Sequence, residues 1–184
     1  MHDINQITDY FIKKSCENGG EGISQTKLQK LLYLSYGWYL TLHDQELFED
    51  CPESWQYGPV FKKIYQRFKG KGNQPITGED MLTICDGIER EVQDFLDDIW
   101  DEYGQYTTEK LANITHDDPV WLQVQKQGYR QPLVKDTVVG YFKYQQEKAQ
   151  ENQDLLDIYE IENRNLQQGL SVGESKEFLK SISL

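Results

Sequence analysis

Apolar residues recur at helical spacing along most of the chain. Ile4, Ile7, Tyr10 and Phe11 lie on one stripe, which predicts an N-terminal helix. Residues 25–42 are apolar on nearly every side, a pattern that is typical of a helix buried on most of its surface. We therefore expect a mainly α-helical, compact domain around a buried central helix.

The segment after the central helix has a different pattern. Short alternations of polar and apolar residues in Glu46–Glu49 and Ser54–Tyr57 allow brief extended segments, so a short β-hairpin fits residues 46–57. Pro59 is suited to the first turn of a helix, because its fixed φ is helical and its missing N–H is not needed there. We therefore expect the next helix to start at Pro59 and to end at Gly70.

The clearest amphipathic helix is expected over about residues 79–103. Its apolar face carries Ile88, Val92 and Phe95 at helical spacing. Its other face is acidic, since residues 79–102 contain ten Asp and Glu and a single arginine. Such a face is commonly just solvated, but it also fits a basic protein partner, whose association it would accelerate. The candidate contact residues are Asp94, Asp97, Asp98 and Asp101.

The chain changes character after about residue 144. Two shorter helices are expected to begin at Thr108 and Pro119, the second with Asp118 as its N-cap. The sequence then becomes rich in Gln and Glu with sparse apolar positions, as in segments that fold on a partner. We expect a helical domain over residues 1–144 and an extension over residues 145–184 that is partly flexible or binds a partner. The candidate binding residues of the extension are Leu155, Ile158, Phe178 and Leu179.

The net charge of −12 is unevenly distributed. Residues 1–75 contain 9 basic and 9 acidic side chains, whereas residues 76–184 contain 10 basic and 22 acidic ones. Nucleic-acid phosphates repel such a chain unless a local basic patch overrides the net charge. One basic cluster lies near a predicted helix C-terminus, where cations are usual, and it supports a nucleic-acid-binding regulator as the alternative function. Its residues are Lys62, Lys63, Arg67 and Lys69.

No residue pattern in the sequence favours an enzyme. Cys16, Cys51 and Cys85 are widely spaced and never form a CxxC pair, so neither a disulfide scaffold nor a cysteine zinc site is expected. His116 is followed by two aspartates but lacks a second ligand at metal-binding spacing. A hydrolase that uses Cys51 or His116 is the least favoured hypothesis, and no metal or cofactor is expected.

The sequence also bears on location. No apolar run approaches the roughly 18 residues that cross a bilayer, and the first residues lack a basic segment followed by an apolar one. We therefore expect a cytoplasmic protein that binds no membrane.

Three segments of the chain together resemble a known family. They are Lys27–Gly37, with the sequence KLQKLLYLSYG, Trp55–Val60, with WQYGPV, and Thr115–Trp121, with THDDPVW. In this order they resemble the Panacea domain of SocA-like antitoxins, a family also described as phage-associated proteins. The third segment departs from the family pattern by Val120, which separates the proline from the tryptophan. The resemblance covers about residues 3–144.

The resemblance implies a mainly helical antitoxin that neutralises a co-encoded toxin by direct protein–protein contact. One branch of the family delivers its toxin to the ClpXP protease, so the resemblance also allows a role as a proteolytic adaptor. It carries over no catalytic residues and implies that the motif residues maintain the fold, with Trp55, Tyr57 and Trp121 packed inside it. The motif residues are Lys27, Leu28, Leu31, Tyr33, Trp55, Tyr57, Gly58, Pro59, Thr115, His116, Pro119 and Trp121.

Overall fold

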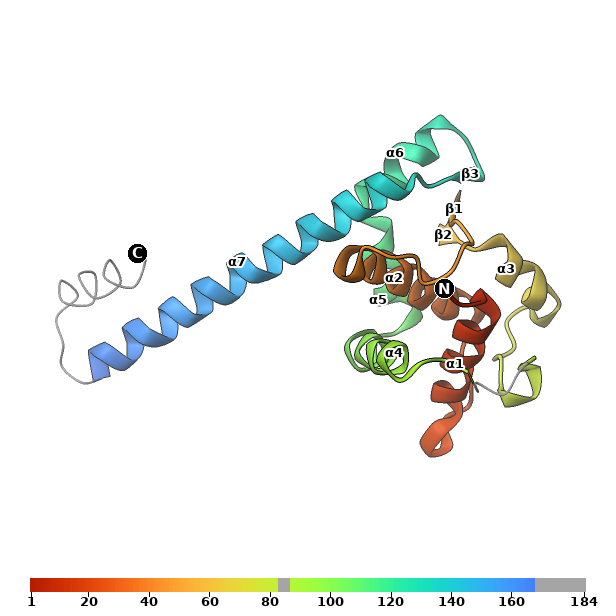
Figure 1. The fold of residues 1–184 in the computed structure, drawn as a ribbon, viewed down its shortest axis with the longest axis horizontal. Coiled ribbons are helices and arrows are strands. Elements are labelled where there is room, and N and C mark those ends of the chain that lie inside the picture. Colours follow the sequence, from red (N-terminus) through yellow and green to blue (C-terminus); the bar gives the residue numbers. More distant parts are fainter. Residues whose placement is uncertain (83–86, 168–184) are drawn as a thin grey trace. The chain divides into compact units, whose positions relative to one another are not determined.

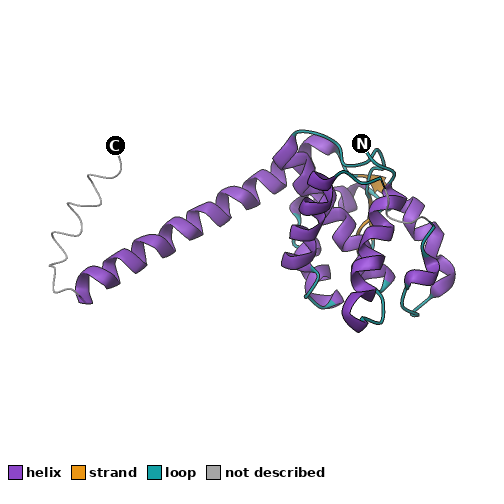
Figure 2. Cartoon of the chain, turned by 60° about the horizontal axis from the view of Figure 1, so that its bottom comes forward, coloured by secondary structure: helices purple, strands orange, loops and turns teal. Residues whose placement is uncertain are grey.

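The computed structural model describes residues 1–82 and 87–167. The chain divides into two compact units, Met1–Phe142 and Lys143–Leu184. Both the helical content and the small sheet agree with the predicted mainly α-helical class (Figures 1 and 2). No helix in the described ranges is both long enough and apolar enough to cross a membrane.

The first unit is built mainly from helices. The α-helices are α1 (Ile4–Cys16), α2 (Gln25–His43), α3 (Lys62–Phe68), α4 (Arg90–Tyr103), α5 (Thr108–His116) and α6 (Pro119–Gln127), and α7 (Lys135–Gln167) begins in this unit and continues into the second. Single 3₁₀ turns are η1 (Glu17–Gly19), η2 (Lys69–Lys71) and η3 (Gly78–Asp80).

A small antiparallel sheet lies beside these helices. Strand β1 (Glu53–Trp55) pairs with β2 (Gly58–Val60) around a tight turn, and β3 (Gln131–Pro132) pairs with the other edge of β1. The predicted hairpin therefore exists, but it begins at Glu53 rather than at the Glu46–Glu49 segment.

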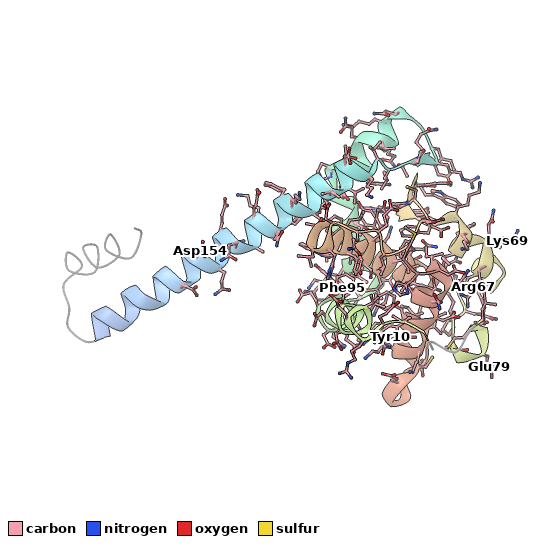
Figure 3. All side chains as sticks on the ribbon, viewed as in Figure 1. Tyr10, Arg67, Lys69, Glu79, Phe95 and Asp154 are labelled. Carbon is pink, nitrogen blue, oxygen red and sulfur yellow. The ribbon has the colours of Figure 1, made fainter. Side chains whose placement is uncertain are left out.

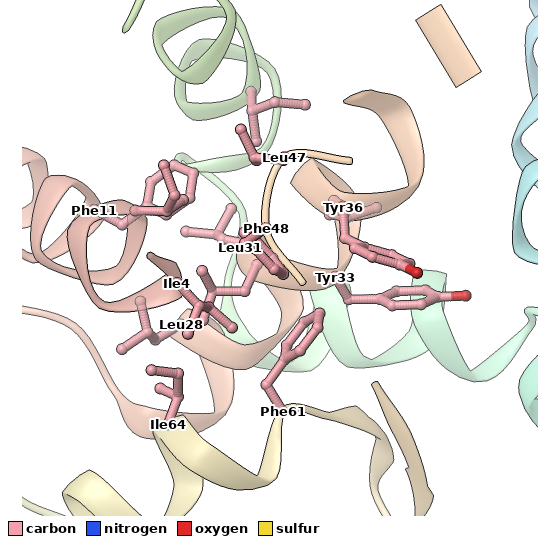
Figure 4. Close-up of a cluster of buried hydrophobic side chains, with 14 of the residues drawn as sticks. Ile4, Phe11, Leu28, Leu31, Tyr33, Tyr36, Leu47, Phe48, Phe61 and Ile64 are labelled. Atoms are coloured by element: carbon pink, nitrogen blue, oxygen red, sulfur yellow. The ribbon is translucent and has the colours of Figure 1, made fainter. Parts of the chain in front are cut away.

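Helix α2 is the buried central helix that the sequence predicts. It contacts α1, α3, α4, α5 and β2, and most of its side chains are buried. Leu28 and Leu31 are fully buried, and Figure 4 shows them packed with Phe11 of α1 and Phe61 before α3. A helix that is apolar on nearly every side is stable only when other elements cover most of its surface, which this arrangement provides.

Capping residues set the starts of several helices. The Asp3 side chain accepts the N–H of Asn5 and completes a capping box with Gln6 at the start of α1. Ser24 Oγ accepts the N–H of Lys27 at the start of α2, 3.2 Å away. These side chains bond backbone N–H groups that have no partner inside the helix.

Two predicted helix starts are wrong. Pro59 lies in β2 opposite Ser54, and α3 begins three residues later, at Lys62. The strand accepts a proline because β2 is at the edge of the sheet, where a missing N–H is tolerated. The acidic helix α4 begins at Arg90 instead of near residue 79, after Gly87 with φ +99° and a separate 3₁₀ turn.

The C-terminal helix is longer than its apolar pattern suggests. Within the second unit α7 continues to Gln167, through the Gln- and Glu-rich sequence in which apolar positions are sparse. Its Gln, Glu, Lys and Ala residues are good helix formers. Pairs one turn apart add support, since Gln150 Nε2 donates to Asp154 Oδ1 and Gln153 Nε2 to Asp157 Oδ1, each at 2.8 Å.

Candidate partner-binding surface

Motif residues from separate parts of the chain meet at the β1–β2 hairpin. The Lys30 ammonium of α2 donates a hydrogen bond to the backbone oxygen of Tyr57 in the hairpin turn. The Trp121 indole of α6 donates to the backbone oxygen of Trp55, 2.9 Å away. Two helices thus hold two carbonyl groups of the hairpin, which fixes its position on the first unit.

A buried hydrogen bond joins the same two helices directly. The Tyr33 hydroxyl of α2 donates to Asp118 Oδ2, and Asp118 Oδ1 accepts the N–H of Val120 at 2.8 Å. Burial raises the pKa of Asp118, against the effect of these hydrogen bonds, and burial next to Asp118 raises the pKa of Tyr33 well above its usual value. Asp118 therefore caps α6, as the sequence predicts, and also ties α6 to α2, which local sequence could not show.

Thr115 and His116 lie at the end of α5, next to this link. Thr115 is buried, and its Oγ1 donates back to the carbonyl of Leu111 at 3.1 Å. The His116 ring stacks on Trp121, with centroids 4.7 Å apart and an interplanar angle of 10°. Its Nε2 is buried, and no hydrogen-bond partner for it lies among the described residues. The His116 ring therefore supports the tryptophan that holds the hairpin.

Gly58 is required by the geometry of the hairpin. Its φ is +99°, a conformation that residues with a Cβ rarely adopt. A Cβ at this position would also lie 2.1 Å from Lys30 Nζ. The motif glycine thus permits both the tight turn and the approach of the lysine.

Tyr57 differs from the sequence prediction. Trp55 and Trp121 are buried, with 8% and 4% of their surface exposed, but Tyr57 is 68% exposed. It occupies the hairpin turn, where its carbonyl faces Lys30 and its side chain is left outside the core. The expectation that all three aromatic residues pack inside is therefore wrong for Tyr57.

The exposed tyrosine belongs to a larger aromatic surface, which we call the hairpin surface and define as Trp55, Tyr57, Tyr65, Tyr129 and Arg130. The Trp55 ring lies 4.6 Å from Tyr65 and 5.9 Å from Tyr129, centroid to centroid. The Arg130 guanidinium lies 4.3 Å from the Trp55 ring centroid, within cation–π range. Sequence reasoning missed Tyr129 and Arg130 because they reach Trp55 only through the pairing of β3 with β1.

A pocket of about 330 Å³ adjoins the hairpin surface. Trp55, Tyr57 and Tyr65 form part of its lining, and Gln29 and Lys30 of α2 form another part. Gln29 is itself fixed, since its amide accepts the N–H of Phe61 at 2.8 Å and donates to the carbonyl of Phe61 at 3.2 Å. Part of the pocket lining is therefore held in place by hydrogen bonds or ring contacts.

Lys30 is the unusual residue of this pocket. Only 1% of its surface is exposed, and burial lowers the pKa of its ammonium to about 7. One feature of the sequence indicates that Lys30 is unusual: it is a lysine inside a predicted helix that is otherwise apolar on most sides. The resemblance placed it within a motif segment, but its contact with Tyr57 depends on the tertiary fold.

The predicted acidic surface on α4 is only partly free for a partner. Asp97 Oδ1 accepts the Tyr10 hydroxyl and binds Lys14 Nζ, each at 2.6 Å, so it ties α4 to α1. Burial opposes the ionisation of Asp97, but these hydrogen bonds outweigh it and lower its pKa. Asp94 pairs with Arg90 at 3.3 Å, whereas Asp98 and Asp101 are exposed.

The predicted tail residues divide between two regions. Leu155 and Ile158 fall within α7. Phe178 and Leu179 lie outside the described residues. A partner contact through the extension stays a prediction.

Two members of the basic cluster, Arg67 and Lys63, have acidic partners within the fold. Arg67 binds Asp9, which is fully buried, and only 11% of the arginine side chain is exposed. Lys63 is exposed and pairs with Asp3 at 2.9 Å, and Lys62 and Lys69 are also exposed. Figure 3 labels Arg67 and Lys69. The four cations are therefore not all free to bind nucleic-acid phosphates, which weakens the regulator hypothesis.

The two residues of the hydrolase hypothesis have different neighbours. Cys51 Sγ lies 4.0 Å from the Tyr36 hydroxyl, whereas His116 stacks on Trp121. Over residues 1–82 and 87–167, no group of three or more His, Cys, Asp and Glu is arranged to hold a metal ion.

The chain matches a known protein family. A family model described as "Antitoxin SocA-like, Panacea domain" matches residues 28–122. No curated protein and no solved structure matches the chain. The matched segment runs from α2 into α6, so it includes Lys30, the hairpin and Trp121.

Proposed function

Because the chain belongs to the SocA-like Panacea-domain antitoxin family, we propose that it neutralises a co-encoded toxin by binding directly to it. The family description supports an antitoxin role in general, and the hairpin surface supports direct contact as its mechanism. Trp, Tyr and Arg are the residue types that contribute most to protein–protein binding energy. We expect the interaction to take place in the cytoplasm.

The observation that carries this proposal is the exposed Tyr57 side chain on a rigid hairpin. A tyrosine that is 68% exposed gains burial when a partner covers it. Its backbone is already fixed by Lys30, so little conformational entropy is lost on binding. Arg130 and Tyr129 extend the same surface and provide further contact area.

The test is co-expression of the neighbouring gene with this chain, followed by growth measurement and pull-down. The wild-type chain should restore growth and co-purify with the toxin. Tyr57→Ala should lower toxin affinity about tenfold or more while leaving the melting temperature unchanged, because the side chain contributes little to the core. Leu42→Ala is the matched control, since Leu42 is 52% exposed at the far end of α2.

Two results would contradict the proposal in different ways. A neighbour that does not arrest growth, or that never co-purifies, removes the toxin as partner. Equal toxin affinity of Tyr57→Ala and Leu42→Ala would leave direct binding intact but exclude the hairpin surface. Delivery to ClpXP is a further proposal within the same function, and a fall in toxin level that depends on the protease would support it.

A further inference from the structure

The pocket beside the hairpin surface has a largely apolar lining that, over the described part of the chain, contains one lysine and no carboxylate, within an acidic protein. Among the described residues that line it, Lys30 alone carries a formal charge. The remaining polar lining consists of amide and hydroxyl side chains, whereas the whole chain has a net charge of −12. An anionic group would therefore meet one cation and no carboxylate in the pocket lining.

Two helix N-termini add to this positive character. The pocket lining includes the start of α2, with the N-cap Ser24 and the first-turn residues Gln25 and Thr26. It also includes Thr108, the first residue of α5. The hydroxyl oxygens of Ser24 and Thr108 lie 3.0 Å apart, so the two helix starts adjoin. The N-terminal end of a helix carries a positive partial charge that favours anions.

Burying Lys30 costs more free energy than a purely structural role explains. A lysine is rarely buried without an anionic partner, because its ammonium loses hydration. The hydrogen bond to the Tyr57 carbonyl uses one of the three donors of the ammonium. A neutral amide side chain could also donate to this carbonyl, so the hydrogen bond alone does not account for a charged group here.

We propose that the pocket receives an acidic side chain of the toxin, whose carboxylate binds at Lys30 and the start of α2. This inference rests on the proposed function, since it specifies how the toxin docks. Trp55, Tyr57 and Tyr65 would pack against the apolar part of the entering segment. The carboxylate supplies the counter-charge that the pocket lining lacks, which makes the contact selective as well as attractive.

A protein segment fits this site better than a free nucleotide. A phosphate group carries more charge than one lysine balances, and phosphate sites usually combine several cations or backbone N–H groups. The exposed Tyr57, Tyr129 and Arg130 also extend the hairpin surface beyond the pocket itself. A ligand confined to a cavity of about 330 Å³ does not need this additional surface.

The first test compares variants of the full chain in their affinity for the toxin. Lys30→Met should weaken binding about thirtyfold or more, the usual effect of removing one member of a desolvated charge pair. Lys27→Met is the matched control, because Lys27 lies one turn away on α2 and donates to the Gly104 carbonyl at 2.5 Å, outside the pocket lining. It should change the affinity less than threefold.

A second pair of variants keeps the test independent of Lys30. Thr26→Glu introduces a carboxylate into the pocket at a position where acidic residues stabilise a helix start. It should weaken toxin binding at least tenfold without lowering the melting temperature, whereas Thr26→Gln, of nearly equal size, should not. Equal affinity of Thr26→Glu and Thr26→Gln, together with unchanged binding by Lys30→Met, would overturn the inference.

A third measurement requires no toxin. A capped hexaglutamate peptide is titrated into the isotope-labelled full chain, with capped hexaglutamine and AMP as separate probes. The inference expects hexaglutamate to shift the Trp55 indole and Gln29 amide signals in the wild type, but not in Lys30→Met. Shifts caused equally by hexaglutamine, shifts caused only by AMP, or the absence of any shift would overturn it.

The two proposals fail in distinguishable ways. If the toxin binds the wild type, Lys30→Met and Thr26→Glu equally well, the direct-binding function stands and the pocket inference falls. If the toxin does not bind the wild type, the proposed function falls, and the peptide titration alone decides whether the pocket accepts carboxylates.

Discussion

The ammonium of Lys30 holds the backbone carbonyl of Tyr57, so a buried lysine supports the turn that exposes a tyrosine. The same lysine lines the pocket next to that turn. Both the position of the hairpin and the charge of the pocket therefore depend on Lys30. Changes at Lys30 should consequently affect both stability and partner binding.

Lys30→Met should alter how stability depends on pH. An unfolded lysine titrates near pH 10.4, whereas burial lowers the pKa of Lys30 in the folded protein to about 7. Between these values the unfolded state binds the extra proton, so the contribution of Lys30 to stability rises with pH. Relative to Lys30→Met, the wild type should gain about 1.4 kcal/mol per pH unit between pH 7.5 and 9.5, and the difference should level off below pH 7.

Urea denaturation of both proteins at pH 6, 7.5 and 9 measures this difference. Other titrating groups are shared by the two proteins, so their contributions cancel in the comparison. Stability curves that stay parallel over the whole range would contradict a lowered pKa at Lys30.

Gly58→Ala should destabilise the protein by about 2 kcal/mol or more. The substitution places a residue with a Cβ at φ +99° and brings that Cβ to within 2.1 Å of Lys30 Nζ. Gly19→Ala separates the two effects, because Gly19 has φ +82° but no neighbouring atom within 4 Å of its Cβ position. It should cost about 1 kcal/mol.

Thermal unfolding of the single and double variants checks this account. Gly58→Ala combined with Lys30→Met should cost less than the sum of the single changes, because the atom that clashes is gone. Strict additivity would show that the strain at Gly58 does not involve the lysine.

Whether the sequence predicts a given feature of this protein depends on whether that feature is local. The burial of α2 and the cap at Asp118 follow from spacing and residue type within one segment, and the structure confirms them. The start of α3 could not be inferred, because the strand pairing of Pro59 with Ser54 overrides its preference for a first helical turn. The acidic helix likewise starts late, since Gly78–Asp80 form a separate 3₁₀ turn and Gly87 has a positive φ.

The candidate site is mostly a tertiary feature. Trp55 meets Tyr65 and Arg130 through the fold, so no pattern within a short window indicates the hairpin surface. The family resemblance marked Trp55 and Tyr57 but did not distinguish the buried side chain from the exposed one. That difference arises because Trp55 lies in β1, whereas Tyr57 occupies the tight turn outside the core.

The aspartates on the acidic face of α4 should differ in how much they contribute to stability. Asp97→Asn should destabilise the protein by about 1 kcal/mol, because it weakens the contacts of α4 with Tyr10 and Lys14. Asp98→Asn should change stability by less than about 0.5 kcal/mol, since Asp98 is exposed. Chemical denaturation near pH 7 distinguishes the two.

The same face gives a prediction for toxin association. Reversing the exposed Asp98 and Asp101 to lysine should lower the association rate at low salt if the toxin is basic overall, and the effect should disappear at high salt. A toxin that is basic overall yet inserts one acidic side chain into the pocket satisfies this prediction and the Lys30 inference together. Stopped-flow measurement at two salt concentrations tests it, and an unchanged rate would remove the acidic face as a contact.

Removal of the C-terminal extension should reveal whether it contributes to binding independently of the hairpin surface. A chain that ends at Tyr144 keeps Phe142, whose ring contacts Tyr33 and Trp38 of α2. The first unit should therefore unfold at a similar temperature after the truncation. The sequence-based prediction is that neutralisation is lost, because the polar extension with sparse apolar anchors is typical of segments that fold on a partner.

Combining the truncation with Thr26→Glu determines how the two regions act. If the extension and the pocket contact the toxin separately, their effects on the free energy of binding should add, since distant and independent changes are additive. Isothermal titration of the toxin into the wild type, both single variants and the double variant provides the four values. A truncated chain that binds and neutralises as well as the full chain would contradict a role for residues 145–184 and leave the hairpin surface as the contact that the toxin requires.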